Sequence, residues 1–406
     1  MLSSACAFSL KWSQTPSSRN RTKTDSRPRN ACDSSWRSNS HSHSDATISL
    51  QEWQSCGTSS QIPAMVIEVV EGLKVLEREM DSQMSFGGIG GKLQIGIGRA
   101  WGLWGLIVGN FKVQEDRKHR ATYQALVDSE KKLQFFAARQ IACRLLGNRG
   151  YLCQKCWLPL EDCMCSKIMP CSLWGGIRFW LYMHPQDFLR QNNTGKLLWQ
   201  LFGVEAATLC LFGIAEHEEI MRNAFKLAVR KGLILIESYF LSGKSTVWCL
   251  YPFQNASTKS VKDILFHGSS GGLEGQSTMS NGTKPMHFVL IDGTWNNSAA
   301  MFRRLKEQAK LVWGEDDLPC ISLTTGVSAM HKLRPQPSWD RTCTAAASIG
   351  LLSELYFLPE FSSYGLDKQA EAVEEALGFL LDALTARRLR MGRSIARRGR
   401  QNINIC

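Results

Sequence analysis

Hydrophobic and polar positions change their pattern midway along the chain. Between residues 62 and 147 the apolar residues recur at three- and four-residue spacing, which predicts helices over residues 66–80 and 122–146. After residue 165, short apolar runs such as RFWLYM and HFVLI alternate with helical patterns. That alternation is typical of an α/β domain with a mostly parallel sheet and helices on both faces.

Polar or turn-forming residues end four of the apolar runs, at His184, Tyr251, Asp292 and Gly326. In open α/β sheets, ligands bind outside the carboxyl ends of the strands. We therefore expect these residues to lie along one rim of the sheet and to form the active site.

Asp292 is the leading candidate on that rim because it follows a buried strand and carries an ionisable group. Gly293 permits a tight turn after it, and residues 296–298 are suited to cap a helix that begins near residue 299. The alternative is that Asp292 only orders the turn.

Four cysteines precede the α/β pattern with the spacing C-x2-C-x6-C-x-C, at Cys153, Cys156, Cys163 and Cys165. Thiolates are soft ligands, and a structural zinc site needs four protein ligands in a tetrahedron. Disulfides or separate buried thiols are the alternative, but Cys163 and Cys165 are too close in sequence to pair with each other. The spacing therefore predicts a structural Zn2+ site.

Composition bounds the class of protein. The chain has 406 residues, of which 44% are hydrophobic, so it can bury a substantial core in one or two domains. Its 14 cysteines are scattered and no apolar signal-peptide core is evident, which favours a reducing compartment over secretion. The longest apolar run, residues 100–109, is about half of what a bilayer needs, so we expect no transmembrane helix.

The net charge of +12, from 48 basic and 36 acidic residues, favours a polyanionic partner. Seven arginines in residues 387–400 lack alternating acidic residues, so we interpret this run as a phosphate-binding tail rather than a solvated helix end. Residues 1–45 are rich in serine and basic residues and resemble either a solvated tail or the transit peptide of a chloroplast or mitochondrial protein.

These patterns divide the chain into four parts. Residues 1–60 are a disordered or transit-like segment, and residues 61–146 are a helical extension with a glycine-rich linker. Residues 147–385 form the α/β domain, with the zinc site at its start. Residues 386–406 are the basic tail.

Seven motifs occur in a fixed order between residues 147 and 385. They are the cysteine cluster, HPQD (184–187), NNTGKLL (192–198), YP (251–252), DGTW (292–295), LRPQP (333–337) and CTAAA (343–347). In this order they resemble the DTW-domain proteins, the tRNA-uridine aminocarboxypropyltransferases. No single motif is specific, but the cysteine cluster, DGTW and LRPQP are jointly specific.

The resemblance implies a knotted α/β fold, similar to that of SPOUT-type methyltransferases, that binds S-adenosylmethionine. It also implies transfer of the 3-amino-3-carboxypropyl group of this co-substrate to N3 of a tRNA uridine, with release of methylthioadenosine. Composition and periodicity by themselves indicate neither the reaction nor the co-substrate.

The resemblance also implies roles for the motif residues. Uridine N3 is a weak nucleophile until it loses its proton, so a base is needed, and Asp292 is the expected catalytic residue. Arg334 is expected to bind a phosphate or the co-substrate carboxylate. Trp295 is expected to stack on adenine or uracil, or else to lie in the core. Further co-substrate contacts are expected from His184, Asp187, Asn193, Thr194, Gly195, Pro252, Thr294 and Thr344.

The sequence departs from the family pattern at two positions. The HPxE of the family is HPQD here, so Asp187 carries its carboxylate on a stem shorter by one methylene. Ala346 stands where the family usually has a glutamate, which removes one expected site carboxylate. Residues 229–245 and 268–283 interrupt the domain as long loops.

Two other functions fit the same residues. One is a zinc-knuckle RNA-binding protein without catalysis, for which the missing glutamate would mark a dead enzyme. The other is a SPOUT-type RNA methyltransferase. The products separate the three hypotheses: methylthioadenosine for the transferase, none for the binding protein, and S-adenosylhomocysteine for the methyltransferase.

Overall fold

A five-stranded, all-parallel sheet forms the centre of the protein. The computed structural model describes residues 48–81, 103–230, 246–251, 260–262, 285–314, 318–323 and 342–393. The strands are β1 (Ile177–Met183), β2 (Ala207–Leu211), β3 (Val247–Leu250), β4 (Met286–Asp292) and β5 (Cys320–Ile321). Their order in the sheet is β2-β1-β4-β3-β5. The α/β prediction is therefore confirmed.

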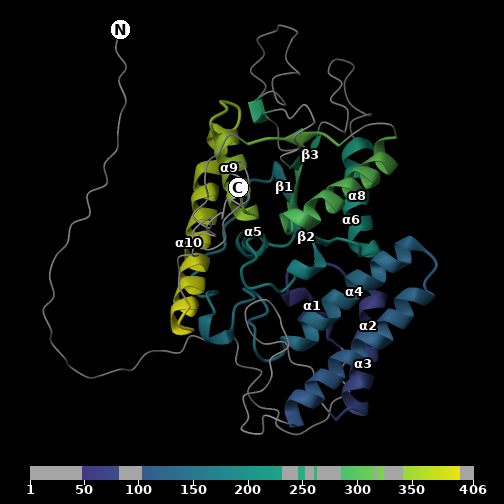
Figure 1. Cartoon of the computed structure of the whole chain (residues 1–406). Coiled ribbons are helices and arrows are strands. Elements are labelled where there is room, and N and C mark those ends of the chain that lie inside the picture. The colour runs from purple at the N-terminus through teal and green to yellow at the C-terminus, as the bar shows by residue number, and fades with distance from the viewer. Residues whose placement is uncertain are drawn as a thin grey trace, which may run out of the picture.

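Helices cover both faces of the sheet (Figure 1). They are α5 (Lys196–Phe202), α6 (Ala215–Arg230), α8 (Trp295–Trp313), α9 (Thr344–Tyr356) and α10 (Leu366–Arg390). Phe179 and Leu181 of β1 belong to the core shared with α5, α9 and α10. Trp180 and Tyr182 belong to the core shared with α6 and α8. Since β1 is buried on both faces, its sequence is a nearly continuous apolar run.

The knotted crossing implied by the resemblance depends on the path from β5 to α9. Residues 324–341 connect these two elements and lie outside the described residues. The parallel sheet with helices on both faces is compatible with a knotted arrangement and with an unknotted one. The knot therefore stays a prediction.

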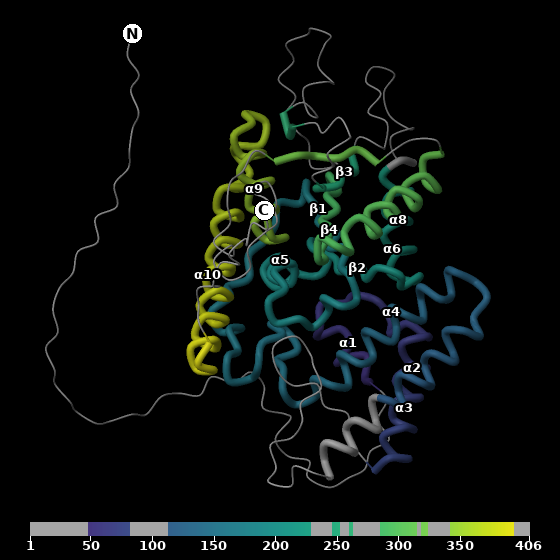
Figure 2. The backbone as a smooth tube through the Cα atoms, in the orientation of Figure 1, coloured from purple at the N-terminus to yellow at the C-terminus, as the bar shows by residue number. Residues whose placement is uncertain are grey.

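The N-terminal extension is helical and lies beside one end of the sheet domain (Figure 2). Its helices are α1 (Leu50–Ser55), α2 (Ala64–Glu79), α3 (Leu103–Ala125) and α4 (Ser129–Gly147). None of the described helices is long and apolar enough to cross a membrane. The helix predicted over residues 122–146 is wrong at its start, because Asp128 caps α4 by accepting a hydrogen bond from the Glu130 amide at 3.0 Å.

Residues 48–60 pack against the α/β domain and do not belong to a disordered tail. The Trp53 side chain is completely buried, and its ring lies 5.9 Å from the ring of Phe188 and 5.8 Å from that of His217. Ser60 Oγ lies 2.7 Å from His217 Nε2. The boundary predicted at residue 60 is therefore too late, because Trp53 and other buried residues of this segment pack into the core.

An ion-pair network around the buried Glu218 carboxylate also joins the extension to the sheet domain. The Arg304 guanidinium of α8 lies 2.6 Å from a carboxylate oxygen of Glu218 in α6 and 2.5 Å from one of Glu130 in α4. Glu218 also accepts a hydrogen bond from the Tyr182 hydroxyl at 2.7 Å. Three helices and β1 are thus held around one buried carboxylate.

Within the extension, Glu115 of α3 is the centre of a second buried cluster. Its Oε1 lies 2.8 Å from His119 Nδ1 and 2.6 Å from Arg139 Nη2 of α4. Burial by itself would raise the pKa of Glu115, but the hydrogen bond with His119 and the charge of Arg139 outweigh it and lower that pKa to about 2. The ionised carboxylate therefore stabilises the α3–α4 contact.

This pKa predicts an acid-dependent loss of stability. The Glu115 pKa is 4.5 in its unperturbed state and about 2 in the fold, so its contribution is present above pH 4.5 and is lost between pH 4.5 and 2. Glu115→Gln should lower the free energy of unfolding at pH 7 by roughly 1–3 kcal/mol. Between pH 5 and pH 3, the free energy of unfolding should fall less in Glu115→Gln than in the wild-type protein, as measured by urea unfolding. Glu79→Gln, at an exposed position of α2, is the control. Equal acid sensitivity of the wild-type and Glu115→Gln proteins would contradict the assignment.

Candidate functional site

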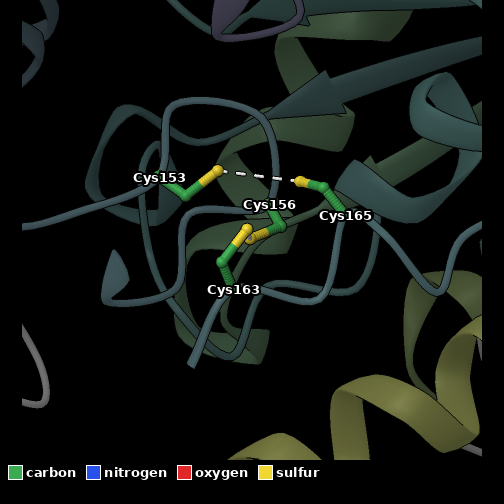
Figure 3. Close-up of side chains that lie close together, drawn as sticks. All are labelled: Cys153, Cys156, Cys163 and Cys165. Carbon is green, nitrogen blue, oxygen red and sulfur yellow. Dashed lines mark hydrogen bonds between the residues drawn. The ribbon is translucent and has the colours of Figure 1, made fainter. Parts of the chain in front are cut away.

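The four cysteines predicted to bind zinc come together in the loop after α4. Their side chains point toward a common centre (Figure 3). The Cys153 and Cys165 sulfurs lie 3.6 Å apart, the Cys156 and Cys163 sulfurs lie 3.8 Å apart, and all four lie within 4.8 Å of one another. A tetrahedral ion with Zn–S bonds of about 2.3 Å has sulfurs about 3.8 Å apart. The cluster therefore has the donor set and the dimensions of a structural zinc site.

Main-chain hydrogen bonds and buried side chains hold this loop in shape. The Cys153 amide donates to the Leu158 carbonyl at 2.7 Å, and the Trp157 amide donates to the Cys153 carbonyl at 2.8 Å. Trp157 has a φ of 57°, which is unfavourable for a tryptophan, yet its side chain is completely buried. Its ring packs against Phe188 and Trp199, so the loop is anchored in the core beneath β1 and α5.

The start of the arginine run fastens α10 to the same loop. The Arg387 side chain is 7% exposed, lies 3.3 Å from an Asp162 carboxylate oxygen and donates a hydrogen bond to the Tyr151 hydroxyl. Arg390 also pairs with Asp162. Assigning the whole run to phosphate contact is therefore wrong for Arg387, because it is buried and paired within the protein. Residues 394–400 lie outside the described residues.

The zinc assignment can be tested by removing one ligand. Cys163→Ser should lower the zinc content well below the expected one ion per chain, and it should lower the thermal midpoint, because structural zinc contributes folding energy. Metal analysis and thermal unfolding measure the two effects. Cys171→Ser is the matched control, since Cys171 is a nearby free thiol outside the cluster. Full zinc occupancy of Cys163→Ser would contradict the four-thiolate site.

The second part of the candidate site lies where β1 and β4 end. These neighbouring strands continue in opposite directions, β1 through α5 to β2 and β4 through α8 to β5. The helices that follow lie on opposite faces of the sheet. Ligands of open α/β sheets bind at such a switch point. The His184 amide donates to the Asp292 carbonyl at 2.9 Å, so the HPQD and DGTW motifs meet there.

The Asp292 side chain joins three elements at this point. It is 6% exposed. Asn193 Nδ2, in the turn before α5, donates to Asp292 Oδ2 at 2.8 Å, and the Thr344 hydroxyl, at the start of α9, donates to Asp292 Oδ1 at 3.1 Å. The end of strand β4, the turn before α5 and the first turn of α9 thus meet at one carboxylate.

Gly195 is required for this arrangement. A Cβ atom at residue 195 would lie 2.1 Å from Asp292 Oδ2, so any other residue would push the carboxylate away. Thr194 accepts a hydrogen bond from the Ala345 amide at 3.4 Å, a second link between α5 and α9. The structure therefore brings together Asn193, Thr194, Gly195, Asp292 and Thr344, as the sequence analysis expects.

His184 and Asp187 lie in the short 3-10 turn η2 (Pro185–Asp187) and its cap. Burial lowers the pKa of His184, and its Nδ1 accepts a hydrogen bond from the Gln186 amide at 3.2 Å. The imidazole is therefore neutral near pH 7. Asp187 pairs with Arg190 at 2.5 Å through Oδ1, while its buried Oδ2 has no hydrogen-bond partner.

The remaining predicted rim residues lie after β3, at the start of α8, or outside the described residues. Tyr251 follows β3, and its ring stacks on that of Phe302 in α8 with the centroids 4.6 Å apart. Gly326 lies outside the described residues. The cap expected at residues 296–298 is wrong, because α8 begins at Trp295 and Thr294 is its N-cap residue. Trp295 is half-buried and follows directly on the rim. Pro252 and Arg334 lie outside the described residues.

Sequence reasoning missed the contribution of the helical extension to this site. Arg144 of α4 donates a hydrogen bond from Nη2 to the Gln186 carbonyl at 2.9 Å, which holds η2 from outside the α/β domain. Trp53 packs on Phe188, the residue after η2. Arg144 could be recognised as a basic residue near the end of a helix. Its partner Gln186 is 42 residues away, so no local pattern indicates their contact.

The protein is therefore an α/β protein that combines a cysteine cluster of the zinc-binding type with polar residues at the switch point of its parallel sheet. The family model of the DTW domain matches residues 150–389, which is more than half of the chain. The chain therefore belongs to the DTW-domain family, which is linked in general to tRNA modification. No solved structure matches it.

Proposed function

We propose that the protein is a tRNA-uridine aminocarboxypropyltransferase. It would transfer the 3-amino-3-carboxypropyl group of S-adenosylmethionine to N3 of a tRNA uridine and release methylthioadenosine. The observation that carries this proposal is the Asp292 carboxylate at the β1/β4 switch point of a DTW domain. The proposed fold includes the SPOUT-like knot between β5 and α9.

The reaction places two demands on the protein. The N3–H proton goes to a base, the N3 electron pair forms a bond to the terminal carbon of the aminocarboxypropyl group, and the carbon–sulfur bond breaks in favour of sulfur. Sulfur leaves neutral as methylthioadenosine, so the leaving group needs no proton. The protein therefore has to supply a base and to align the two substrates in line.

The described residues support an assignment of these roles. Asp292 is the proposed base, oriented by Asn193 and Thr344. Asp187 is the proposed acceptor for the co-substrate amino group, because one of its buried carboxylate oxygens has no partner. Arg334 is proposed to bind the co-substrate carboxylate, and Trp295 to stack on a base.

The product of the reaction tests the proposal directly. Purified protein should release methylthioadenosine from S-adenosylmethionine only when tRNA is present, and the tRNA nucleosides should gain the aminocarboxypropyl mass. Liquid chromatography with mass spectrometry measures both products. Release of S-adenosylhomocysteine would indicate a methyltransferase, and tRNA binding without either product would indicate a binding protein.

Asp292→Asn separates a base from a structural turn residue. An asparagine can keep both contacts, because its amide oxygen accepts from Asn193 and its amide group donates to the Thr344 hydroxyl. The variant should fold and bind both substrates, yet transfer about a hundredfold or more slowly, because it cannot accept the N3 proton. Raising the pH should restore part of the rate as N3 ionises without help.

Thr344→Val provides the matched comparison for that experiment. It removes the hydrogen bond to Asp292 Oδ1 but leaves the carboxylate in place. If Asp292 is the base, Thr344→Val should lower the rate only about tenfold or less. If Asp292→Asn keeps full activity, or if both variants lose the same activity together with stability, Asp292 is a structural residue.

The basic tail is proposed to bind tRNA phosphates through the arginines beyond α10. Truncation after Arg393 keeps the Arg387 and Arg390 contacts and removes three arginines, at residues 397, 398 and 400. Affinity for tRNA should fall, and the negative slope of log K against log salt should become shallower by about 2–3, because each of the three lost phosphate contacts changes it by about 0.7–0.9. The full-length triple variant Arg397→Gln, Arg398→Gln, Arg400→Gln should give the same result. An unchanged slope in both proteins would exclude the tail from phosphate contact.

A further inference from the structure

Lys196 is a buried lysine between the cysteine loop and the rim. It is the first residue of α5, and its side chain is completely buried. Its ammonium donates a hydrogen bond to the Gln191 carbonyl at 2.7 Å and lies 5.7 Å from the centre of the Trp157 ring, which belongs to the cysteine loop. A buried ammonium costs several kcal/mol unless anions compensate it.

The anions that act on Lys196 are the cluster thiolates and Asp292. Burial lowers the pKa of Lys196 to about 7, and the charges of Cys156, Cys153, Cys165 and Asp292 act in the opposite direction. A zinc ion held by four thiolates has a formal charge of −2. Cys153 and Cys156 are buried, so water screens this side of the dianion poorly, and the Lys196 ammonium lies on this side, over the ring of Trp157, the residue after Cys156.

Among the residues that the structure describes, other basic side chains near the loop are paired elsewhere or exposed. Arg387 and Arg390 pair with Asp162. Lys155 lies within the loop, but it is exposed, and water screens its charge. Lys167 lies over the Phe379 ring.

Asp292 and the side chains of Asn193 and Thr344 that bond to its carboxylate are here named the Asp292 clamp. The backbone of Lys196 is linked to this clamp. The Lys196 amide donates to Asn193 Oδ1 at 3.0 Å, and Nδ2 of the same asparagine donates to Asp292 Oδ2 at 2.8 Å. A displacement of the Lys196 side chain would therefore move the turn that orients Asp292.

We propose that Lys196 is the counter-cation of the zinc–tetrathiolate centre and that it couples metal binding to the geometry of the Asp292 clamp. Lys196 acts as a positioning residue, because its side chain is completely buried and its ammonium is bound to the Gln191 carbonyl. The proposal rests on the zinc site and not on the transfer reaction.

Zinc retention without tRNA or S-adenosylmethionine is the first test. Lys196→Met removes the charge, and Lys196→Gln removes the charge but keeps a hydrogen-bond donor for the Gln191 carbonyl. Both should lose zinc to a competing chelator at about 10- to 100-fold lower chelator concentration than the wild-type protein. Lys155→Met, the same charge change at the exposed position of the loop, should behave like the wild-type protein.

Hydrogen exchange in excess zinc is the second test, because it reports on the clamp while the metal site is filled. The amides of Leu197 and Leu198 bond to the carbonyls of Thr194 and Gly195, and their exchange should become faster in Lys196→Gln. Peptides from the cysteine loop should keep wild-type protection. If Lys196→Met does not fold, Lys196→Gln carries both tests.

Two results would overturn the proposal. Wild-type zinc retention in Lys196→Gln would show that charge is not required at this position. Unchanged exchange at residues 197 and 198 would show that the metal site and the clamp are independent. Since neither measurement involves product formation, failure of the proposed transferase activity would leave both readouts interpretable.

Discussion

The candidate site depends on the hydrogen bonds that the Asp292 carboxylate accepts. This carboxylate lies at the end of the central strand β4 and accepts hydrogen bonds from Asn193 before α5 and Thr344 at the start of α9. Helices α5 and α9 cover one face of the sheet, so the Asp292 side chain holds the N-terminal ends of both helices against the rim. The close packing of Gly195 against Oδ2 leaves no space for a larger residue. The Asp292 carboxylate, which we propose as the base, is therefore held in place by the same contacts that shape the fold.

The cysteine loop is part of this arrangement and not an appendage. Its Trp157 packs on Phe188, the residue after the HPQD turn, and on Trp199 in α5. The helical extension reaches the same turn from the other side through Trp53 and Arg144. Three segments that are distant in sequence thus support the few residues that follow β1. Precise placement of reacting groups requires this kind of rigid support.

Local patterns made the fold class and much of the candidate site predictable. Strands buried on both faces are apolar runs, and their polar ends mark the rim, so His184 and Asp292 were identifiable. Four cysteines within 13 residues were recognisable as a cluster that could hold one metal ion, because their spacing by itself brings the sulfurs close together. The boundary between α3 and α4 was missed, although Asp128 is a typical N-cap residue, because the apolar spacing continues across it.

Contacts between distant residues could be decided only by the tertiary structure. Arg387 looked like a phosphate ligand in a basic run, yet its partner Asp162 lies 225 positions earlier. Lys196 looked like an ordinary helix residue, and its burial beside the cysteine loop depends on how α5 packs. The segment around Trp53 has no periodic apolar pattern, although Trp53, Cys56 and Thr58 are buried against the rest of the protein. Sequence patterns report spacing along one element, whereas burial and charge pairing depend on which elements meet, and that is determined by the packing of the whole chain.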